Sequence, residues 1–283
     1  MLKRLTATQV EEYETEGFTC PVPVLSTAEV REARAAIEAF EAKTGRTFDY
    51  PEKSKSYLLF DWAEKLIRHP AVLDAVEDLI GPDIMVYHTT MWIKDSGTPQ
   101  YIAWHQDGTY FYLDPQLHVT AWVALSDASV EAGCMHVLPG SHLDGQQDHA
   151  DDTSPDNLIL RGQAIFGKFE GEKGTPMPLK AGEMSLHHTR LVHCSHPNNA
   201  PDRRMGFGIS YIPAHVRDIG STPGSAMLVR GEDRQGNFVR EQRIGGELSP
   251  EAYTNHERLM KAFRARQDAA AEIKKKVEYA PVR

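Results

Sequence analysis

The sequence predicts a mainly β protein with flanking helices, of the double-stranded β-helix (jelly-roll, cupin-like) class. The central part of the chain holds short runs rich in β-branched and aromatic residues, and Gly, Pro, Asp and Asn separate them. No long helical pattern lies between these runs, which favours antiparallel sheets over βαβ units. The expected strands are Ile84–Ile93, Val119–Leu125, Met135–Leu138, Glu183–His188 and Phe207–Ile212.

The length and composition fit one domain. The chain has 283 residues, of which 41% are apolar and 25% charged, enough for a single sizeable core. We expect a helical N-terminal buttress at about 1–83, a jelly-roll core at about 84–215, and a C-terminal extension with a helix at about 216–283.

Helices are expected mainly in the first third of the chain. Ser26 and Glu29 form a capping-box pattern, which predicts that a helix begins directly after them. Thr6 is a candidate N-cap for the first helix, and Gly17 marks its end. The three expected helices run from Thr6 to Gly17, over Ala28–Ala42, and from His69 to Gly81.

Two later segments depart from this pattern of short strands. The polar, Gly- and Asp-rich stretch from Leu143 to Lys180 is too long for a turn, so it is either a functional lid or a disordered excursion. A helix is expected from Ser249 to about Val277. It ends in the basic cluster Lys274–Lys276, which we interpret as a solvated helix end stabilised by the helix dipole.

The net charge narrows the possible partners, and the cysteine content indicates the cellular compartment. The formal net charge of −9 argues against nucleic acid and against anionic membrane surfaces. The three cysteines, Cys20, Cys134 and Cys194, are odd in number and widely spaced, as expected in a reducing compartment. We find no signal peptide and no stretch of roughly 18 apolar residues. The sequence therefore predicts a cytoplasmic protein, and a homodimer stays open because the C-terminal helix could cover a partner.

The stretch Trp104–Gly108 contains the triplet His-Gln-Asp. In an extended strand, residues i and i+2 share a face, so His105 and Asp107 can converge on one point. With a second histidine they would form the two-histidine, one-carboxylate arrangement that suits non-haem Fe(II). Such a triplet alone is weak evidence, because most isolated examples are surface residues.

The third ligand should come from the segment Leu186–Asn198, where four histidines compete: His187, His188, His193 and His196. The pair Arg203-Arg204 follows this segment. If the metal holds an organic diacid, the far carboxylate needs a planar bidentate partner, and arginine is the residue that provides one.

These motifs together resemble the phytanoyl-CoA dioxygenase family of Fe(II)- and 2-oxoglutarate-dependent oxygenases, over roughly residues 5–215. The matching blocks are Leu5 to Val10, Glu16 to Phe18, His105 to Asp107, Ala121 to Asp127, Glu131 to Met135, Leu138 to His142, Leu179 to Met184, and His193 to Ser195 followed by Arg203 and Arg204.

The resemblance implies an iron(II) site made of His105, Asp107 and His193. Family spacing places the 2-oxoglutarate arginine eleven residues after the distal histidine, which selects Arg204. The further residues that it implies for the cosubstrate are Ser195, Trp122, Lys55 and Thr90. His142 matches a structural turn residue and is expected not to bind metal.

The implied reaction uses 2-oxoglutarate and dioxygen and releases succinate and carbon dioxide. Related halogenases carry Ala or Gly in place of the carboxylate ligand, so Asp107 favours hydroxylation. Two rival classes are a jelly-roll protein that binds a metal or ligand without oxygenase activity and a zinc hydrolase. Neither of them requires Arg204 at its position.

Several classes of substrate are compatible with the resemblance. Family members act on acyl-CoA thioesters, compatible solutes, organophosphonates and natural-product intermediates. Pro281–Arg283 is not a peroxisomal address, which weakens the acyl-CoA hypothesis. Aromatic residues near the triplet either line a pocket, form a cage for an alkylammonium group, or pack in the core: Trp92, Trp104, Tyr110, Phe111 and Tyr112. We expect a small polar or cationic metabolite, with Trp104 and Tyr110 as candidate substrate contacts.

Overall fold

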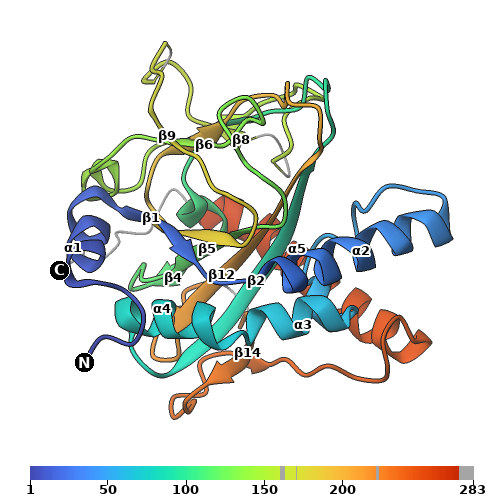
Figure 1. Ribbon diagram of the computed structural model, residues 1–283. Helices are drawn as coiled ribbons and strands as arrows, with labels where there is room; N and C mark the ends of the chain where they lie inside the picture. The colour runs from blue at the N-terminus through green and yellow to red at the C-terminus, as the bar shows by residue number, and fades with distance from the viewer. Residues whose placement is uncertain (160–162, 170, 221–222, 274–283) are drawn as a thin grey trace.

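Two facing β-sheets form the centre of the molecule, with helices outside the larger one (Figure 1). The computed structural model of the chain describes residues 1–159, 163–169, 171–220 and 223–273, without the side chains of Tyr110, Gln163 and residues 268–273. The double-stranded β-helix with flanking helices is confirmed.

The larger sheet has seven strands, and only its last pair, β14 with β15, is parallel. In spatial order the strands are β1 (Phe18–Pro23), β10 (Glu183–His188), β5 (Val119–Ala124), β12 (Arg204–Pro213), β2 (Ile84–Lys94), β14 (Ser225–Arg230) and β15 (Val239–Arg240).

The smaller sheet has four antiparallel strands: β3 (Ile102–His105), β11 (His193–Ser195), β6 (Met135–Val137) and β9 (Thr175–Met177). Two short pairs flank the sheets, namely β4 (Leu113–Asp114) with β13 (Arg217–Asp218), and β7 (Ala150–Asp151) with β8 (Gln163–Ala164). All five expected strands are present, each within three residues of its predicted ends.

Alternation along the strands separates the main core from the interior between the sheets. In β12, Met205, Phe207 and Ile209 join the main apolar cluster, which extends to the helices on the outer face of the larger sheet. The alternate residues Arg204 and Ser210 face the other way and line a cavity. The same backbone therefore supplies both the core and the polar lining of a site.

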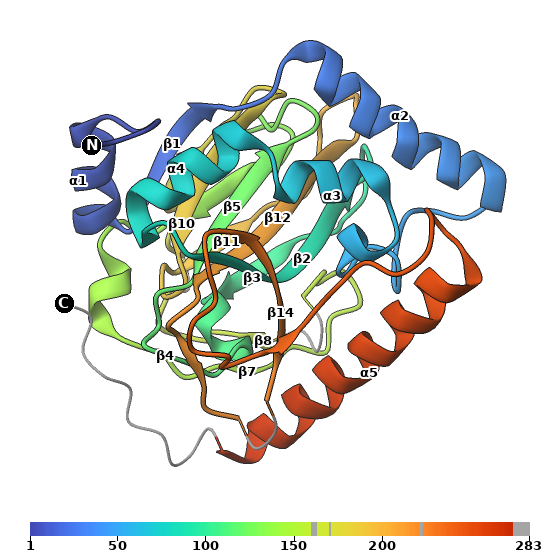
Figure 2. The same cartoon turned by 90° about the horizontal axis from the view of Figure 1, so that it is seen from below.

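The helices pack mainly on the outer face of the larger sheet, where α4 contacts β5 and β12 (Figure 2). The helices are α1 (Ala7–Glu16), α2 (Thr27–Thr44), α3 (Asp61–Ile67), α4 (Pro70–Ile80) and α5 (Pro250–Ile273), with the short 3-10 helices η1 (Ser56–Leu58), η2 (Asp107–Tyr110) and η3 (Ser141–Asp144).

The three N-terminal helices predicted from sequence are confirmed. Thr6 and Ser26 form capping boxes at the starts of α1 and α2. Gly17 ends α1 in the left-handed conformation, with φ 83°. The seven-residue helix α3 was not predicted, because so short a segment gives little periodic signal.

Both ends of the chain contribute to the larger sheet. The apolar run after Gly17 forms edge strand β1, and β14, from the C-terminal part, pairs with β2. The domain boundaries at about residues 83 and 215 stay a prediction. Helix α5 is described as far as Ile273, so the basic cluster Lys274–Lys276 lies outside the described residues.

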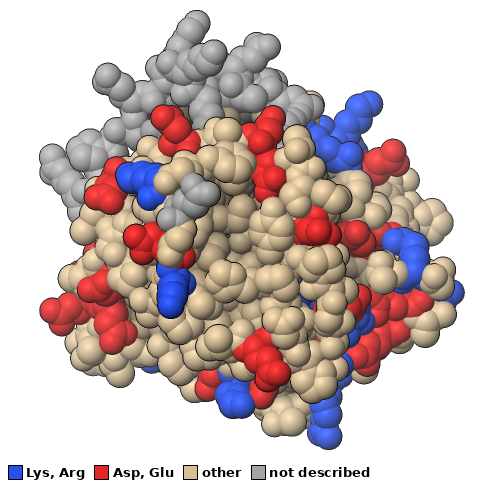
Figure 3. Space-filling model, turned by 90° about the horizontal axis from the view of Figure 1, so that it is seen from above, with Lys and Arg blue, Asp and Glu red and all other residues tan. Residues whose placement is uncertain are grey.

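The described part of the segment 143–180 packs on the smaller sheet. The Ile165 amide donates to the carbonyl of Trp104 on β3, and β9 pairs with β6. Seen from above, the surface of the molecule carries acidic and basic side chains side by side, and most of them lie away from the centre of this view (Figure 3). Among the described residues, no helix is both long and apolar enough to cross a membrane.

Candidate metal centre

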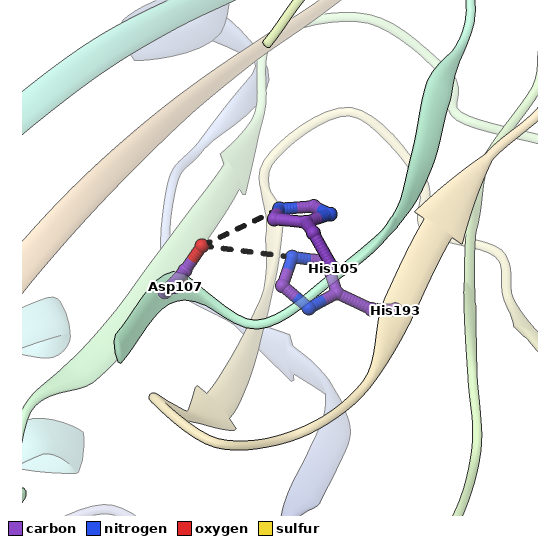
Figure 4. A group of neighbouring side chains, drawn as sticks. All are labelled: His105, Asp107 and His193. Carbon is purple, nitrogen blue, oxygen red and sulfur yellow. Dashed lines mark ion pairs between the residues drawn. The ribbon is translucent and has the colours of Figure 1, made fainter. Parts of the chain in front are cut away.

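Three side chains from the smaller sheet and its edge converge at one point (Figure 4). The Oδ1 atom of Asp107 lies 3.6 Å from Nε2 of His105 and 3.7 Å from Nε2 of His193. One ligand atom from each of the three residues lies within 4.8 Å of the other two. Because His105 and His193 are paired residues of β3 and β11, the sheet register itself brings the two imidazoles together.

The local conformation differs from the extended strand expected through Asp107. Strand β3 ends at His105, and Asp107 begins the 3-10 helix η2. Gln106 still has an extended backbone, with φ −125° and ψ 134°. One extended residue between them is enough to keep His105 and Asp107 on the same side.

Each histidine presents the same nitrogen to the centre. Nδ1 of His105 donates to the carbonyl of Ala103, and Nδ1 of His193 donates to that of Leu191, both at 2.9 Å. This bond fixes the tautomer with a free lone pair on Nε2. Burial, with a contribution from neighbouring His105, holds the pKa of His193 well below its ordinary value, so its imidazole is neutral at pH 7.

The carboxylate of Asp107 is held by neighbours that the sequence did not reveal. The Thr120 hydroxyl on β5 donates to Oδ2 at 2.6 Å, which leaves Oδ1 facing the histidines. Nε2 of His187 lies 3.4 Å from the same Oδ2. Gln106, fully buried, donates to the carbonyls of Gly145 and Arg190 and so anchors the corner between β3 and η2.

Two imidazole nitrogens and one carboxylate oxygen are a donor set that fits Fe(II). Three ligands on one side leave positions open for other molecules. The residues present therefore fit the metal that the sequence implied.

A cavity of about 280 Å³ opens beside the three ligands. Arg204, one of the residues that line it, is 2% exposed, and no described carboxylate pairs with it. Its guanidinium lies over the ring of Trp122 at 5.0 Å, and its Nε has no hydrogen-bond partner. Burial lowers the pKa of Arg204 to about 10, so it stays charged at neutral pH. A buried cation without a partner is costly and calls for an anion from outside the chain.

Most of the predicted site residues meet in this cavity. Besides the three candidate ligands, its lining includes Arg204, Ser195, Trp122 and Thr90. Trp92 and Phe111 also line it. The Tyr110 side chain, predicted as a substrate contact, lies outside the described residues.

Lys55 does not line the cavity, so its position does not support the predicted contact with the cosubstrate. Its side chain is fully buried and forms an ion pair with Glu241, and it also donates to the Tyr87 carbonyl at 2.8 Å. Its sequence neighbours Lys53 and Ser54 are the residues that reach the cavity.

Trp104 also lies away from the cavity, which does not support its predicted role as a substrate contact. It precedes His105 in strand β3, so its side chain projects from the opposite face. There it lines a separate hollow and lies near Phe169, with ring centroids 6.4 Å apart. His142 is placed as expected for a turn residue, with its Nε2 3.1 Å from the Glu14 carbonyl.

The helix α5 supplies a wall of the cavity that the sequence did not predict. The lining residues recur at helical spacing along one face: Met260, Phe263, Arg264 and Gln267. Phe263 stacks on His88 of β2, with ring centroids 4.5 Å apart and an interplanar angle of 11°. This contact is tertiary, and only the 3.6-residue period of the stripe hints at it.

The jelly-roll fold, with two histidines and a carboxylate in a cavity that an unpaired arginine also lines, defines a non-haem iron oxygenase class. Residues 13–206 match the model of the phytanoyl-CoA dioxygenase (PhyH) family. The chain belongs to this family, and it is a 2-oxoglutarate-dependent non-haem iron oxygenase that uses Fe(II) and 2-oxoglutarate.

Relatives and solved structures agree with this class. The chain is 25% identical over 227 residues to a probable alpha-ketoglutarate-dependent hypophosphite dioxygenase of Stutzerimonas stutzeri, covering 74% of this chain and 79% of the relative. It resembles the non-heme monooxygenase ThoJ in its apo form, with a TM-score of 0.80 and 32% identity over 93% of this chain and 99% of ThoJ. It also shares its fold with CytC3 bound to Fe(II) and alpha-ketoglutarate, with a TM-score of 0.63 and 21% identity over 87% and 97% of the two chains.

Proposed function

We propose that the protein hydroxylates a small metabolite, using dioxygen and 2-oxoglutarate and releasing succinate and carbon dioxide. The observation that carries this proposal is the unpaired, buried Arg204 in the same cavity as the three candidate ligands. A metal-binding or hydrolytic jelly roll has no need of that cation. A cosubstrate with two carboxylates does.

His105, Asp107 and His193 hold the iron in this proposal. When bound, iron and 2-oxoglutarate together supply the oxygen activation that removes a substrate hydrogen and returns a hydroxyl group. The chain contributes fixed ligand orientation through Ala103, Leu191 and Thr120. This preorganisation keeps the open metal positions facing the cavity.

Arg204 binds the far carboxylate of 2-oxoglutarate in a bidentate manner, and Ser195 adds a hydroxyl beside it. Trp122 packs against the guanidinium and lines the same cavity. Thr90 borders the same space from β2. Asp107 occupies the position that halogenases leave open, which favours hydroxylation.

The substrate in this proposal is small and polar, for example a compatible solute, an organophosphonate or a natural-product intermediate. A cavity of about 280 Å³ suits a molecule of this size. A cationic substrate would need an acidic partner, but the cavity residue Asp49 pairs with Lys53 at 2.7 Å. An acyl-CoA substrate is the alternative within the same family.

We also propose a cytoplasmic location, since all three cysteines are free thiols, as a reducing compartment requires. A homodimer stays a proposal that a sedimentation measurement can test.

The test is turnover under ¹⁸O₂. Enzyme loaded with Fe(II) and supplied with 2-oxoglutarate and a panel of small metabolites should release succinate that carries one ¹⁸O atom, and the hydroxylated product should carry the other. The matched variant Asp107→Ala should release neither. Unlabelled succinate, or full activity of Asp107→Ala, would contradict the proposal.

A further inference from the structure

A second buried basic side chain lies behind the cavity wall. Lys94 is the last residue of β2, and its side chain is 0% exposed. Its Nζ donates to Ser195 Oγ at 2.7 Å, to the Ser195 carbonyl at 3.2 Å and to the His196 carbonyl at 2.6 Å. No carboxylate pairs with Lys94 within the described chain. Burying an ammonium group without an anion is costly, so its retention needs a reason.

The contact with Ser195 sets the direction of that hydroxyl. In its charged form Lys94 has three donors and no acceptor, one donor for each of the three oxygens around Nζ, so Ser195 Oγ must accept from it. The single hydroxyl hydrogen of Ser195 is then left for another acceptor. Ser195 lines the cavity together with Arg204, so an anion bound there is the acceptor within reach.

Lys94 and Arg204 also face each other directly in the pairing of β2 with β12. Burial, followed by the charge of Arg204, lowers the pKa of Lys94 to about 6, and an anion bound beside the pair favours the charged form of Lys94. Two neighbouring cations that lack a carboxylate are mutually unfavourable until an anion binds. Of the two residues, Arg204 lines the cavity, so an anion that enters the cavity can pair with it.

We propose that Lys94 is a positioning residue for 2-oxoglutarate, an inference that rests on the function proposed above. It holds Ser195 so that the hydroxyl donates to the far carboxylate, and its charge adds to that of Arg204. The chelating end of the cosubstrate does not depend on Lys94.

The experiment compares two keto acids on the Fe(II)-loaded protein without oxygen. 2-Oxoglutarate has the far carboxylate, whereas 2-oxopentanoate has the same length and lacks it. Dissociation constants follow from the visible absorption of the iron chelate. Lys94→Met should raise the dissociation constant of 2-oxoglutarate by about tenfold or more. The dissociation constant of 2-oxopentanoate should stay within about twofold of the wild-type value. The surface variant Lys180→Met, whose side chain is 76% exposed, should change neither constant.

Two more variants separate direct from indirect effects. In the Ser195→Ala background, most of the cost of Lys94→Met should disappear, because Lys94 acts through that hydroxyl. Lys94→Gln keeps a donor to Ser195 without the charge and should give an intermediate loss. It also serves as the readout if Lys94→Met does not fold.

The outcomes distinguish this inference from the proposed function. If Lys94→Met weakens the binding of both keto acids equally, the effect is structural. That result, or unchanged binding of both keto acids, overturns the role of Lys94 and leaves the proposed function standing. A wild-type protein that forms no chelate overturns the proposed function, and this inference with it.

Discussion

His105 and His193 face each other as paired residues of β3 and β11, with ring centroids 4.0 Å apart. Each imidazole donates from Nδ1 to the carbonyl two residues earlier in its own chain segment. The two candidate ligands are therefore positioned by one sheet register and by one repeated local hydrogen bond. Metal binding should depend on this pair far more than on the other histidines nearby.

The first prediction concerns the metal ligands. His193→Ala removes one of three donors and should weaken Fe(II) or Co(II) binding by more than about 100-fold, beyond the 10- to 100-fold typical of outer-shell changes. The measurement is metal content after dialysis together with calorimetric titration. His196→Ala, three residues later and not in the lining of the cavity, is the matched control and should bind metal normally. Equal metal binding by both variants would refute the assignment of His193.

The second prediction concerns the hydroxyl that holds Asp107. Thr120→Val keeps the shape of the side chain but removes the 2.6 Å bond to Oδ2. Metal affinity should fall by about 10- to 100-fold, because a ligand loses its fixed orientation. Thr89→Val is the control, since the Thr89 hydroxyl is buried without a partner and its loss should be neutral or stabilising. Wild-type metal affinity in Thr120→Val would show that the hydroxyl is not needed.

The third prediction concerns the close approach of Trp122 to β12. A Cβ atom on Gly206 would lie 1.7 Å from the Trp122 ring, so Gly206→Ala must displace the indole. Because Arg204 lies over that ring, 2-oxoglutarate affinity should fall about tenfold or more, with roughly 1–3 kcal/mol of stability lost to overpacking. Gly246→Ala meets nothing within 4 Å and is the control. If Gly206→Ala keeps full affinity, the position of Trp122 does not matter for binding of 2-oxoglutarate.

The fourth prediction concerns stability at low pH. His188 is 5% exposed and accepts at Nδ1 from the Arg190 amide, so it is neutral in the folded protein. Burial, with the nearby His142, lowers its pKa to about 3. The contribution of neutral His188 to the free energy of unfolding is complete above its unfolded-state pKa of about 6.5. It is lost as the pH falls toward 3, at about 1.4 kcal/mol per pH unit.

Urea unfolding between pH 7 and 4.5 measures this effect. His188→Asn retains an acceptor for the Arg190 amide but cannot titrate, so its stability should fall less steeply over that range than that of the wild type. The exposed His215→Asn is the control and should follow the wild type. A slope for His188→Asn equal to that of the wild type would contradict this account.

Sequence patterns were sufficient for the features that depend on local spacing. Capping patterns located the starts of α1 and α2, Gly17 located the end of α1, and alternation with turn residues located the strands. Alternation also could have excluded Trp104, because a residue adjacent to His105 in a strand must face the other way. The same rule could have suggested Thr120, which shares a face of β5 with Trp122.

Other features could not be predicted because they are tertiary. The partner of Lys55 is Glu241, 186 positions away, and nothing near either residue indicates the ion pair. The role of Lys94 could not be predicted from its sequence neighbours, since it depends on the pairing of β2 with β12 and on a turn more than 100 residues later. The wall formed by α5 depends equally on where the C-terminal helix docks.

The most direct test of the central claim is an anaerobic titration of the Fe(II)-loaded protein with 2-oxoglutarate. A visible charge-transfer band should appear and saturate at one equivalent. In Arg204→Met the same band should need about 100-fold more 2-oxoglutarate, because a buried bidentate charge pair is lost. No band with the intact protein, or a band that Arg204→Met leaves unchanged, would contradict the account.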